Sequence, residues 1–345
     1  MKTILVTAVG APPGLNVVRA IHESEKYKIV VSDAKQNSIG LYQYNLPYLI
    51  SPLANDKLYL KKIISFAKKH NVCGIIPCIE EDALLFSKEI QTLKSYGINV
   101  NLPDYEQISI ASNKGLMTQK CKENNIPHPE SIVLSSGEDN LFKKVTEFLK
   151  RIDGPYIVKP TFGHGMKGVF TTYDAKETLE KIEAAECECI LQEKIPGKAG
   201  SMYLSALLYD KKGEIIRRFA SRSLLTLHED GGPAVAGESV YSPELIDRLE
   251  TLVNSIGSWS GPINAEWMLD PRDDEWKFIE VNPRHWGYGY LSVASGCNFP
   301  LANAAITCGD DPGKDNGYEY GVVMARNSFD YILQKHSFQL LHTKE

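Results

Sequence analysis

Along the first hundred residues, short apolar runs alternate with amphipathic stretches. The apolar runs have the length and composition of strands, and they lie at 3–8, 28–32 and 72–78. The stretches that follow them repeat their apolar positions with a helical period, at 16–24, 59–70 and 82–96. Strands that alternate with helices are typical of a parallel sheet with crossover helices. The pattern therefore predicts an N-terminal α/β unit.

From about Pro103 onward the pattern becomes a mixture of helices and strands. Helices are predicted at 104–124, 139–151 and 175–185, and strands at 156–159 and 189–193. After Gly200 the pattern favours an antiparallel arrangement, with strands at 203–209 and 215–220, a helix at 243–256 and a final hairpin. The polar, turn-rich tail after about Gly309 predicts no particular element.

The most informative signal lies in that hairpin. Its arms, 263–269 and 276–282, flank a polar stretch with turn chemistry. Folding the hairpin about Asp273 places Glu266 directly opposite Glu280, and two carboxylates that face each other across antiparallel strands repel. A solvated acidic pair on an exposed strand face is the alternative interpretation.

The residues after Glu280 extend the signal toward metal chemistry. Side chains alternate along a strand, so Asn282 points to the same face as Glu280. Two carboxylates and an amide oxygen that converge on one face suit a hard cation such as Mg²⁺. Arg284 follows, and its fork of donors could hold a phosphate or a carboxylate.

A second signal is a lysine at the end of a strand followed by a glycine-rich loop. Lys159 ends the strand, and the loop contains Gly163, His164, Gly165 and Gly168. Glycines let backbone donors approach phosphate oxygens closely, and a lysine adds a point charge. The order of residues is not that of a P-loop. A flexible surface turn explains the loop equally well, and a loop histidine is more often incidental.

A third signal is an apolar strand that runs into a polar pair and then a Pro-Gly break. It comprises Gln192, Glu193, Lys194 and Ile195, before Pro196 and Gly197. A hinge between two lobes has this character, and its backbone groups can bind the edge of an adenine. A strand end with a turn is the simpler interpretation of the segment alone.

Two polar segments near the N-terminus have structural explanations. The turn at 10–14 lacks the G-x-G-x-x-G spacing, and its prolines remove backbone donors that would face a pyrophosphate. It is interpreted as a tight strand-to-helix turn, which disfavours a dehydrogenase. The acids at 80–82 follow a strand at the edge where α/β sheets place ligands, but a helix start explains their acidity equally well.

Composition narrows the class of protein. The chain has 345 residues, 43% of them hydrophobic, which is enough for two or three compact units. Its net charge is −5, and no basic stripe points to nucleic acid. No apolar run approaches the ~20 residues needed to cross a bilayer, and the start reads as a strand rather than a signal peptide. Seven cysteines, an odd number, favour free thiols and a cytoplasmic location.

The order of these signals resembles the ATP-grasp superfamily of carboxylate ligases. The order is Lys114 on a helix, Lys159 with its glycine loop, the hinge, then Glu266 and the run Glu-x-Asn-Pro-Arg from Glu280. The resemblance covers about residues 1–305. It implies an α/β and α+β fold, in which a parallel-sheet domain precedes a two-lobed ATP-grasp fold. The implied divisions are an N-terminal domain, a small lobe, a large lobe and an unassigned C-terminal segment, at 1–108, 109–192, 193–310 and 311–345.

The resemblance also implies roles for individual residues. Lys114 and Lys159 match the phosphate-binding lysines, and Gly163 to Gly168, His164 and Gly165 included, match the loop that closes over the phosphates. The segment from Gln192 to Ile195 matches the adenine hinge. The implied metal ligands are Glu266, Glu280 and Asn282, which would hold Mg²⁺ or, alternatively, Mn²⁺, and Arg284 matches the arginine that steadies the transferred phosphoryl group.

Two departures from the family pattern limit this assignment. Asn113 precedes Lys114 where many relatives have Asp, and no acid for the ribose is evident after the hinge. Arg222, on a basic strand near the loop at 231–238, is expected to contact a substrate carboxylate or acyl phosphate, although a solvated basic strand is equally consistent. The segment at 285–290 is expected either to line an acceptor pocket or to pack in the core.

The implied function is that of an ATP- and Mg²⁺-dependent carboxylate–amine ligase. It would act through an acyl phosphate, on small-molecule acids and amines that resemble amino acids, as a homodimer by analogy with similar enzymes. Two alternatives stay open: an ATP-grasp kinase that stops at a phosphorylated product, and a nucleotide-binding regulatory module without turnover.

Overall fold

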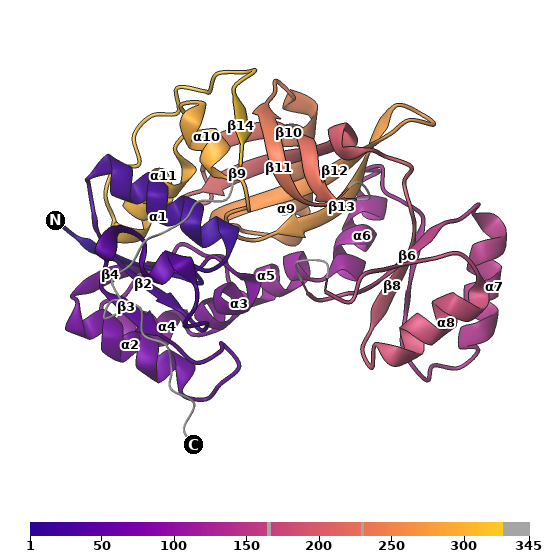
Figure 1. Ribbon diagram of the computed structural model, residues 1–345, viewed down its shortest axis with the longest axis horizontal. Helices are drawn as coiled ribbons and strands as arrows, with labels where there is room; N and C mark the ends of the chain where they lie inside the picture. The colour runs from indigo at the N-terminus through magenta and orange to yellow at the C-terminus, as the bar shows by residue number, and fades with distance from the viewer. Residues whose placement is uncertain (164–166, 229–230, 327–345) are drawn as a thin grey trace.

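Three β-sheets lie in a row along the long axis of the molecule (Figure 1). A four-stranded sheet at the N-terminal end is followed by a six-stranded sheet in the middle and a second four-stranded sheet at the far end. The computed structural model describes residues 1–163, 167–228 and 231–326. Among these residues no helix is long and apolar enough to span a membrane.

The N-terminal sheet is entirely parallel, with strand order β3-β2-β1-β4, as the alternation of strands and helices predicts. Its strands are β1 (Thr3–Thr7), β2 (Lys28–Asp33), β3 (Tyr48–Ile50) and β4 (Val72–Ile76). Its helices are α1 (Pro12–Ser24), α2 (Tyr59–Lys69), α3 (Glu80–Lys88) and α4 (Ile90–Ser95), with short 3-10 turns at Ile39–Leu41 and Gln43–Asn45. Helix α1 starts at the two prolines, which the first turn of a helix tolerates because its N–H groups are unpaired there.

Two helices lead out of this domain where the sequence predicts one. They are α5 (Tyr105–Ser112) and α6 (Lys114–Glu123), and Asn113 separates them with extended backbone angles. The side-chain oxygen of Asn113 accepts a hydrogen bond from Leu116 N at 3.0 Å, which caps α6. The break therefore makes Lys114 the first residue of a helix.

The small sheet is antiparallel, with strand order β5-β8-β6-β7. Its strands are β5 (Ser131–Leu134), β6 (Tyr156–Pro160), β7 (Phe170–Thr172) and β8 (Cys189–Glu193). Two helices pack on it, α7 (Leu141–Arg151) and α8 (Ala175–Ala184), and share a core that includes Phe148, Val158 and Leu191.

The central sheet is antiparallel, with strand order β13-β12-β9-β10-β11-β14. A 3-10 turn at Ala199–Ser201 leads into β9 (Met202–Tyr209), β10 (Ile215–His228), β11 (Gly231–Ser239), β12 (Gly261–Asp270) and β13 (Glu275–Asn282). The segment for which the sequence predicts no element supplies the edge strand β14 (Val323–Ala325).

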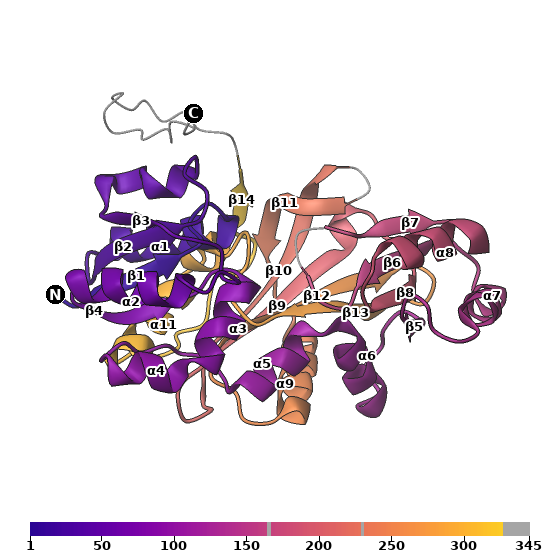
Figure 2. The same ribbon diagram turned by 90° about the horizontal axis from the view of Figure 1, so that it is seen from below.

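Helices cover both faces of the central sheet. Helix α9 (Pro243–Ile256) packs on one face, in a core with Trp267 and Leu207. On the other face α10 (Tyr290–Ala294) and α11 (Phe299–Cys308) pack in a core with Phe219 and Trp286. Helix α11 also contacts β4 and α1, so it joins the central sheet to the N-terminal domain (Figure 2).

Candidate functional site

The hairpin of β12 and β13 brings the two predicted carboxylates together. Glu266 lies directly opposite Glu280, and Asn264 lies opposite Asn282, as the spacing predicts. The register then shifts by one residue before Trp267 pairs with Phe278. This bulge leaves Ile279 without a partner across the hairpin, and its carbonyl oxygen accepts a hydrogen bond from Lys159 Nζ at 3.5 Å.

The carboxylate pair carries electrostatic strain. Burial and the charge of Glu280 raise the pKa of Glu266 to about 7. Arg284 and the two lysines act in the opposite direction but do not cancel the increase. A divalent cation between the two carboxylates would relieve their repulsion, so the pair has the charge and the oxygen donors of a Mg²⁺ site.

Both predicted lysines converge on this pair from separate elements. Lys114, at the start of α6, places its Nζ 3.8 Å from Glu280 Oε2 and donates a hydrogen bond to Gly163 O at 2.6 Å. Lys159, in β6, is only 5% exposed. Burial lowers the pKa of Lys159 to about 8, while the charges of Glu280 and Glu266 work against that decrease. The ammonium groups therefore sit beside the carboxylates, where phosphates could bridge them.

Arg284 and Asn282 form the other side of the cluster. Arg284 donates a hydrogen bond to Asn282 Oδ1 at 2.7 Å and another to His285 O at 2.9 Å. The amide oxygen predicted as a metal ligand is thus already an acceptor, and it keeps a second lone pair for a cation. No group of three or more His, Cys, Asp or Glu residues that could hold a metal occurs in the described parts of the chain.

The two residues that follow Arg284 are buried and pack within the protein. His285 is 3% exposed, and burial lowers its pKa to about 3, so the ring is neutral. Its Nε2 atom contacts Asn303 Nδ2 of α11 at 3.0 Å. Trp286 is 2% exposed and stacks on Phe219. Of the two interpretations of this segment, core packing holds for Trp286.

The glycine loop is described only at its ends. Gly163 and Gly168 both have positive φ angles, of 132° and 74°, which suit glycine. His164 and Gly165 lie outside the described residues. Lys114 contacts the start of the loop through Gly163 O, so the loop begins beside the carboxylate pair.

The hinge is held by backbone and side-chain contacts at the end of β8. Gln192 is buried in the strand, and the N–H groups of Glu193 and Lys194 donate to Glu130 O and Pro155 O at 2.9 and 3.1 Å. Ile195 N makes no backbone hydrogen bond with any described residue, so it is the amide of this group that a ligand could use.

A salt bridge not predicted from the sequence joins the segment from Gln192 to Ile195 to the hairpin of β12 and β13. Arg272, in the hairpin turn, places its Nη1 atom 2.5 Å from Glu193 Oε1 and also pairs with the buried Asp270. Arg272 and Glu193 are 79 positions apart in the sequence, and no local sequence pattern connects them.

The structure does not bring Arg222 to the carboxylate pair. Glu280, Glu266, Leu204 and Ser221 stand opposite one another across β13, β12, β9 and β10, so their side chains share one face of the sheet. Arg222 follows Ser221 and therefore points to the other face. There it pairs with Glu238 at 2.5 Å across β10 and β11.

The N-terminal turn has no room for a dinucleotide at its acidic residue. Asp33, at the end of β2, accepts hydrogen bonds from Gly10 N at 2.6 Å, Lys35 N at 2.8 Å and Ser38 Oγ at 2.6 Å. A side chain at Gly10 would meet Ser38 Oγ at 2.2 Å. The carboxylate that would bind a ribose in a dinucleotide fold is thus used within the protein, as the interpretation of a tight turn requires.

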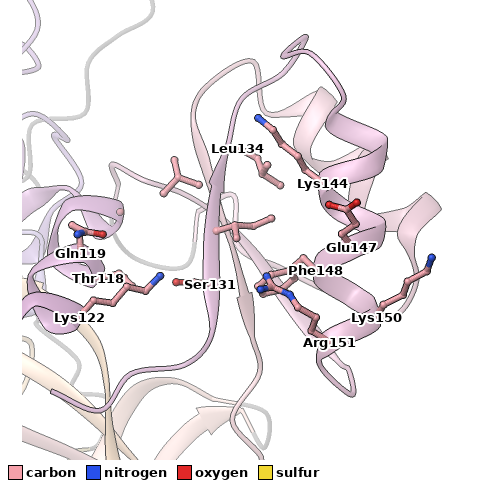
Figure 3. A pocket seen from close by; sticks show the side chains of 13 residues that line it. Thr118, Gln119, Lys122, Ser131, Leu134, Lys144, Glu147, Phe148, Lys150 and Arg151 are labelled. Carbon is pink, nitrogen blue, oxygen red and sulfur yellow. The ribbon is translucent and has the colours of Figure 1, made fainter. Parts of the chain in front are cut away.

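An open hollow of about 770 Å³ lies between α6 and α7, with β5 along it. Figure 3 shows Lys144, Glu147, Lys150 and Arg151 of α7 on one side of it and Lys122 of α6 on the other, with β5 between them. None of the predicted catalytic, nucleotide-binding or metal-binding residues lines it.

Comparison with known proteins places the chain in a family. Residues 111–287, just over half of the chain, match the model of the ATP-grasp domain. The matched range contains both lysines, the hinge and the carboxylate hairpin. The protein belongs to the ATP-grasp family.

Curated relatives are distant and longer than this chain. Over 196 residues the chain is 24% identical to D-aspartate ligase of Enterococcus faecium (strain Aus0004), which covers 52% of this chain and 45% of that protein. Over 200 residues it is 25% identical to mitochondrial acetyl-CoA carboxylase of Saccharomyces cerevisiae (strain YJM789), covering 54% of this chain and 8% of that protein. The chain thus spans less than half the length of these relatives.

Solved structures share the fold over nearly the whole chain. An N5-carboxyaminoimidazole ribonucleotide synthetase aligns with a TM-score of 0.67 at 18% identity, covering 91% of this chain and 79% of that one. Biotin carboxylase from Campylobacter jejuni gives 0.71 at 18% identity, covering 93% and 74%. L-Amino acid ligase from Bacillus licheniformis gives 0.63 at 14% identity, covering 89% and 74%. These likenesses confirm the predicted fold class, an N-terminal parallel-sheet domain followed by an ATP-grasp fold.

Proposed function

We propose that the protein is an ATP- and Mg²⁺-dependent carboxylate–amine ligase that acts through an acyl phosphate. The observation that carries the proposal is the pair Glu266 and Glu280, which lie opposite each other with Lys114 and Lys159 beside them. The two carboxylates repel each other and could bind a cation, and the two ammonium groups beside them could bind phosphates. A metal–nucleotide complex would supply both. Membership of the ATP-grasp family supports ATP as the source of those phosphates.

Each group of residues has a distinct role in this proposal. Lys114 and Lys159 bind phosphate oxygens, and Glu266, Glu280 and Asn282 hold the metal. Mg²⁺ bound there would neutralise the negative charge that develops during phosphoryl transfer. Arg284, held 2.7 Å from Asn282 Oδ1, is placed to steady the phosphoryl group as it moves to the substrate carboxylate.

The remaining residues position the nucleotide and exclude water. The free amide of Ile195 would bind the adenine edge, with Gln192, Glu193 and Lys194 shaping the hinge. The loop that starts at Gly163 would close over the phosphates, because an acyl phosphate exposed to water hydrolyses. Arg222 has no part in this proposal, since it points away from the pair.

We propose the same division of the chain as the resemblance implies. The N-terminal domain is 1–108, the small lobe 109–192 and the large lobe 193–310. The segment 311–345 adds β14 to the large lobe within the part that the structure describes.

Amino-acid-like acids and amines are the proposed substrates. D-Aspartate ligase and L-amino acid ligase, by their names, act on amino acids, and both resemble this chain. We also propose a cytoplasmic location, in keeping with seven free cysteines, and a homodimer as the assembly.

An ADP-release screen tests the function. Amino acids would be supplied singly and in pairs with ATP and Mg²⁺, and mass spectrometry would identify the products. The proposal expects ADP formation that depends on a pair and yields a condensed product. ADP formation with one acid and no dependence on an amine would instead indicate the kinase, and nucleotide binding without any ADP formation would indicate the regulatory module.

A further inference from the structure

Strand β5 lies at the edge of the small sheet, and one side of it is unpaired. Among the described residues β5 pairs with β8 alone. Glu193 N of β8 donates a hydrogen bond at 2.9 Å to Glu130 O, just before β5. Backbone groups point alternately to the two sides of a strand, so every second residue from Glu130 directs its N–H and C=O groups toward β8. The backbone groups of Ser131 and Val133 therefore point away from the sheet.

These outward backbone groups have no partner. The N–H and C=O groups of Ser131 and Val133 form no hydrogen bond with any described residue. Val133 is 43% exposed, so this edge is open to water. Natural edge strands are commonly protected by a charged side chain, a proline, a bulge or a covering segment. The sequence of β5, Ser-Ile-Val-Leu, contains neither a charge nor a proline, so the edge can accept an extended segment as a further strand.

The hollow between α6 and α7 runs along this edge. All four residues of β5 line it, with Thr118 and Gln119 of α6 on one side and Phe148 of α7 on the other (Figure 3). A strand of this length spans about 13 Å, at about 3.3 Å per residue. The volume of about 770 Å³ therefore lies where a short extended segment would pair with β5.

Exposed basic side chains flank the hollow on both sides. Lys122, in the last turn of α6, and Lys150 and Arg151, in the last turn of α7, line the hollow and form no salt bridge with any described residue. The helix dipole favours a basic residue in each last turn. It does not require both groups of charges to flank the same unpaired edge. Together they make the surroundings of β5 positively charged.

The other charges at the hollow are already paired. Lys144 Nζ lies 2.8 Å from Glu138 Oε1, and Glu147, the one acid in the described lining, places its Oε1 atom 3.9 Å from Lys143 Nζ. A second copy of β5 would bring the same excess of positive charge to the edge and would be repelled. An acidic segment would be attracted. Because side chains alternate along a strand, its carboxylates would meet α6 on one face and α7 on the other.

We propose that the hollow along β5 binds an acidic, extended segment of a partner protein, which adds as a strand to the outer edge of β5. Hydrogen bonds to Ser131 and Val133 hold the backbone of the segment, and Lys122, Lys150 and Arg151 hold its carboxylates. The proposal goes beyond the ligase function and does not depend on it, because none of the residues proposed to bind ATP or the metal lines the hollow.

Peptide selection on the full-length protein tests the proposal. A library of random peptides displayed on phage is panned against the wild type, and the recovered peptides are synthesised with a fluorescent label. Fluorescence anisotropy then gives the Kd of each peptide for the wild type and for variants. The proposal expects recovered peptides that are rich in Asp and Glu, contain β-branched residues and lack proline at their centre.

Val133→Pro tests the strand pairing. It removes an outward N–H group and spares the hydrogen bonds to β8, because an edge strand tolerates proline where the N–H group faces solvent. The variant should raise the Kd about tenfold or more, whereas Val133→Thr, which keeps the N–H group and a branched side chain, should leave it within about twofold of the wild type. If Val133→Pro does not fold, N-methylation of alternate amides in the peptide removes hydrogen bonds of the same ladder and should have the same effect.

Reversal of two charges tests the electrostatic part. Lys122→Glu combined with Lys150→Glu should raise the Kd about 30-fold at low ionic strength, and the effect should shrink as salt is added. Lys143→Glu is the matched control, because Lys143 is an exposed residue of α7 that does not line the hollow. This control should leave the Kd within about twofold of the wild type.

An equal Kd for the wild type and folded Val133→Pro overturns the proposal, because the peptides would then bind elsewhere. An equal Kd for the wild type and the double lysine variant overturns it as well. Recovery of peptides without an excess of acids, or of no peptide that binds above background, has the same consequence. Single-stranded DNA that displaces the peptides and binds Val133→Pro as well as the wild type would also overturn the proposal, and would indicate a site for polyanions.

Discussion

Replacing Glu266 by glutamine should stabilise the metal-free protein at alkaline pH, although it should also abolish turnover. Glutamine has nearly the same shape as glutamate and carries no charge. It therefore removes the repulsion with Glu280 and leaves the packing of the hairpin unchanged. The opposite effects on stability and activity distinguish a functional carboxylate from a structural one.

The magnitude follows from the pKa of Glu266, which is raised from 4.5 to about 7. A shift of this size corresponds to about 3 kcal/mol at about 1.36 kcal/mol per pKa unit. Because Glu266 is partly exposed, solvent screening reduces the expected gain to about 1–2 kcal/mol.

The direction of the pKa shift of Glu266 determines the pH range in which the mutation changes stability. The folded protein binds the proton more tightly than the unfolded chain, so this group favours folding least when it is ionised. The wild type should lose stability as the pH rises from about 4.5 through about 7, and the loss should be complete above that range. Glu266→Gln should lack this component.

Urea unfolding in the presence of EDTA, at about pH 5 and about pH 8, measures the difference. Tryptophan fluorescence is a suitable probe, because all four tryptophans, at 259, 267, 276 and 286, lie between α9 and α10, in the part of the chain that contains the hairpin. Glu214→Gln, in the exposed turn between β9 and β10, is the matched control and should behave as the wild type. Equal pH dependence in the wild type and Glu266→Gln would refute the reasoning.

Two further predictions concern basic residues. Lys159 has a pKa lowered to about 8, so in the nucleotide-free protein it loses its charge as the pH rises through 8; the affinity for Mg·ATP, measured by calorimetry, should fall between about pH 7 and 9, and Lys159→Gln should abolish that dependence. An unchanged pH profile in Lys159→Gln would exclude Lys159 as the titrating group. Arg222→Gln should keep kcat/KM within about threefold of the wild type, because Arg222 points away from the carboxylate pair. A loss of about 100-fold or more would show that the other face of the sheet contributes to catalysis.

Elements with regular periodicity could be predicted from the sequence. The parallel N-terminal sheet and the pairing of Glu266 with Glu280 follow from spacing, because side chains alternate strictly along a strand. The shift of register by one residue between this pair and Trp267 does not follow from spacing. The break between α5 and α6 could not be separated from a continuous helix, since it depends on one side chain, Asn113, which caps the second helix.

Contacts between distant segments could not be predicted. The strand β14 is three residues long, and only its pairing with β11 defines it. The basic strand predicts a substrate-binding role for Arg222. The register between β9 and β10 places its side chain on the face of the sheet opposite to Glu266 and Glu280.

Binding of Mn²⁺, as a spectroscopic substitute for Mg²⁺, tests the central claim most directly. Electron paramagnetic resonance would follow Mn²⁺ added to the protein with a non-hydrolysable ATP analogue, in the wild type and in Glu280→Gln. The carboxylate pair as the metal site predicts saturable binding in the wild type that weakens about 100-fold in the variant, while the variant keeps its fold. Equal Mn²⁺ affinity in the two proteins would contradict the assignment of Glu266 and Glu280 as the metal ligands.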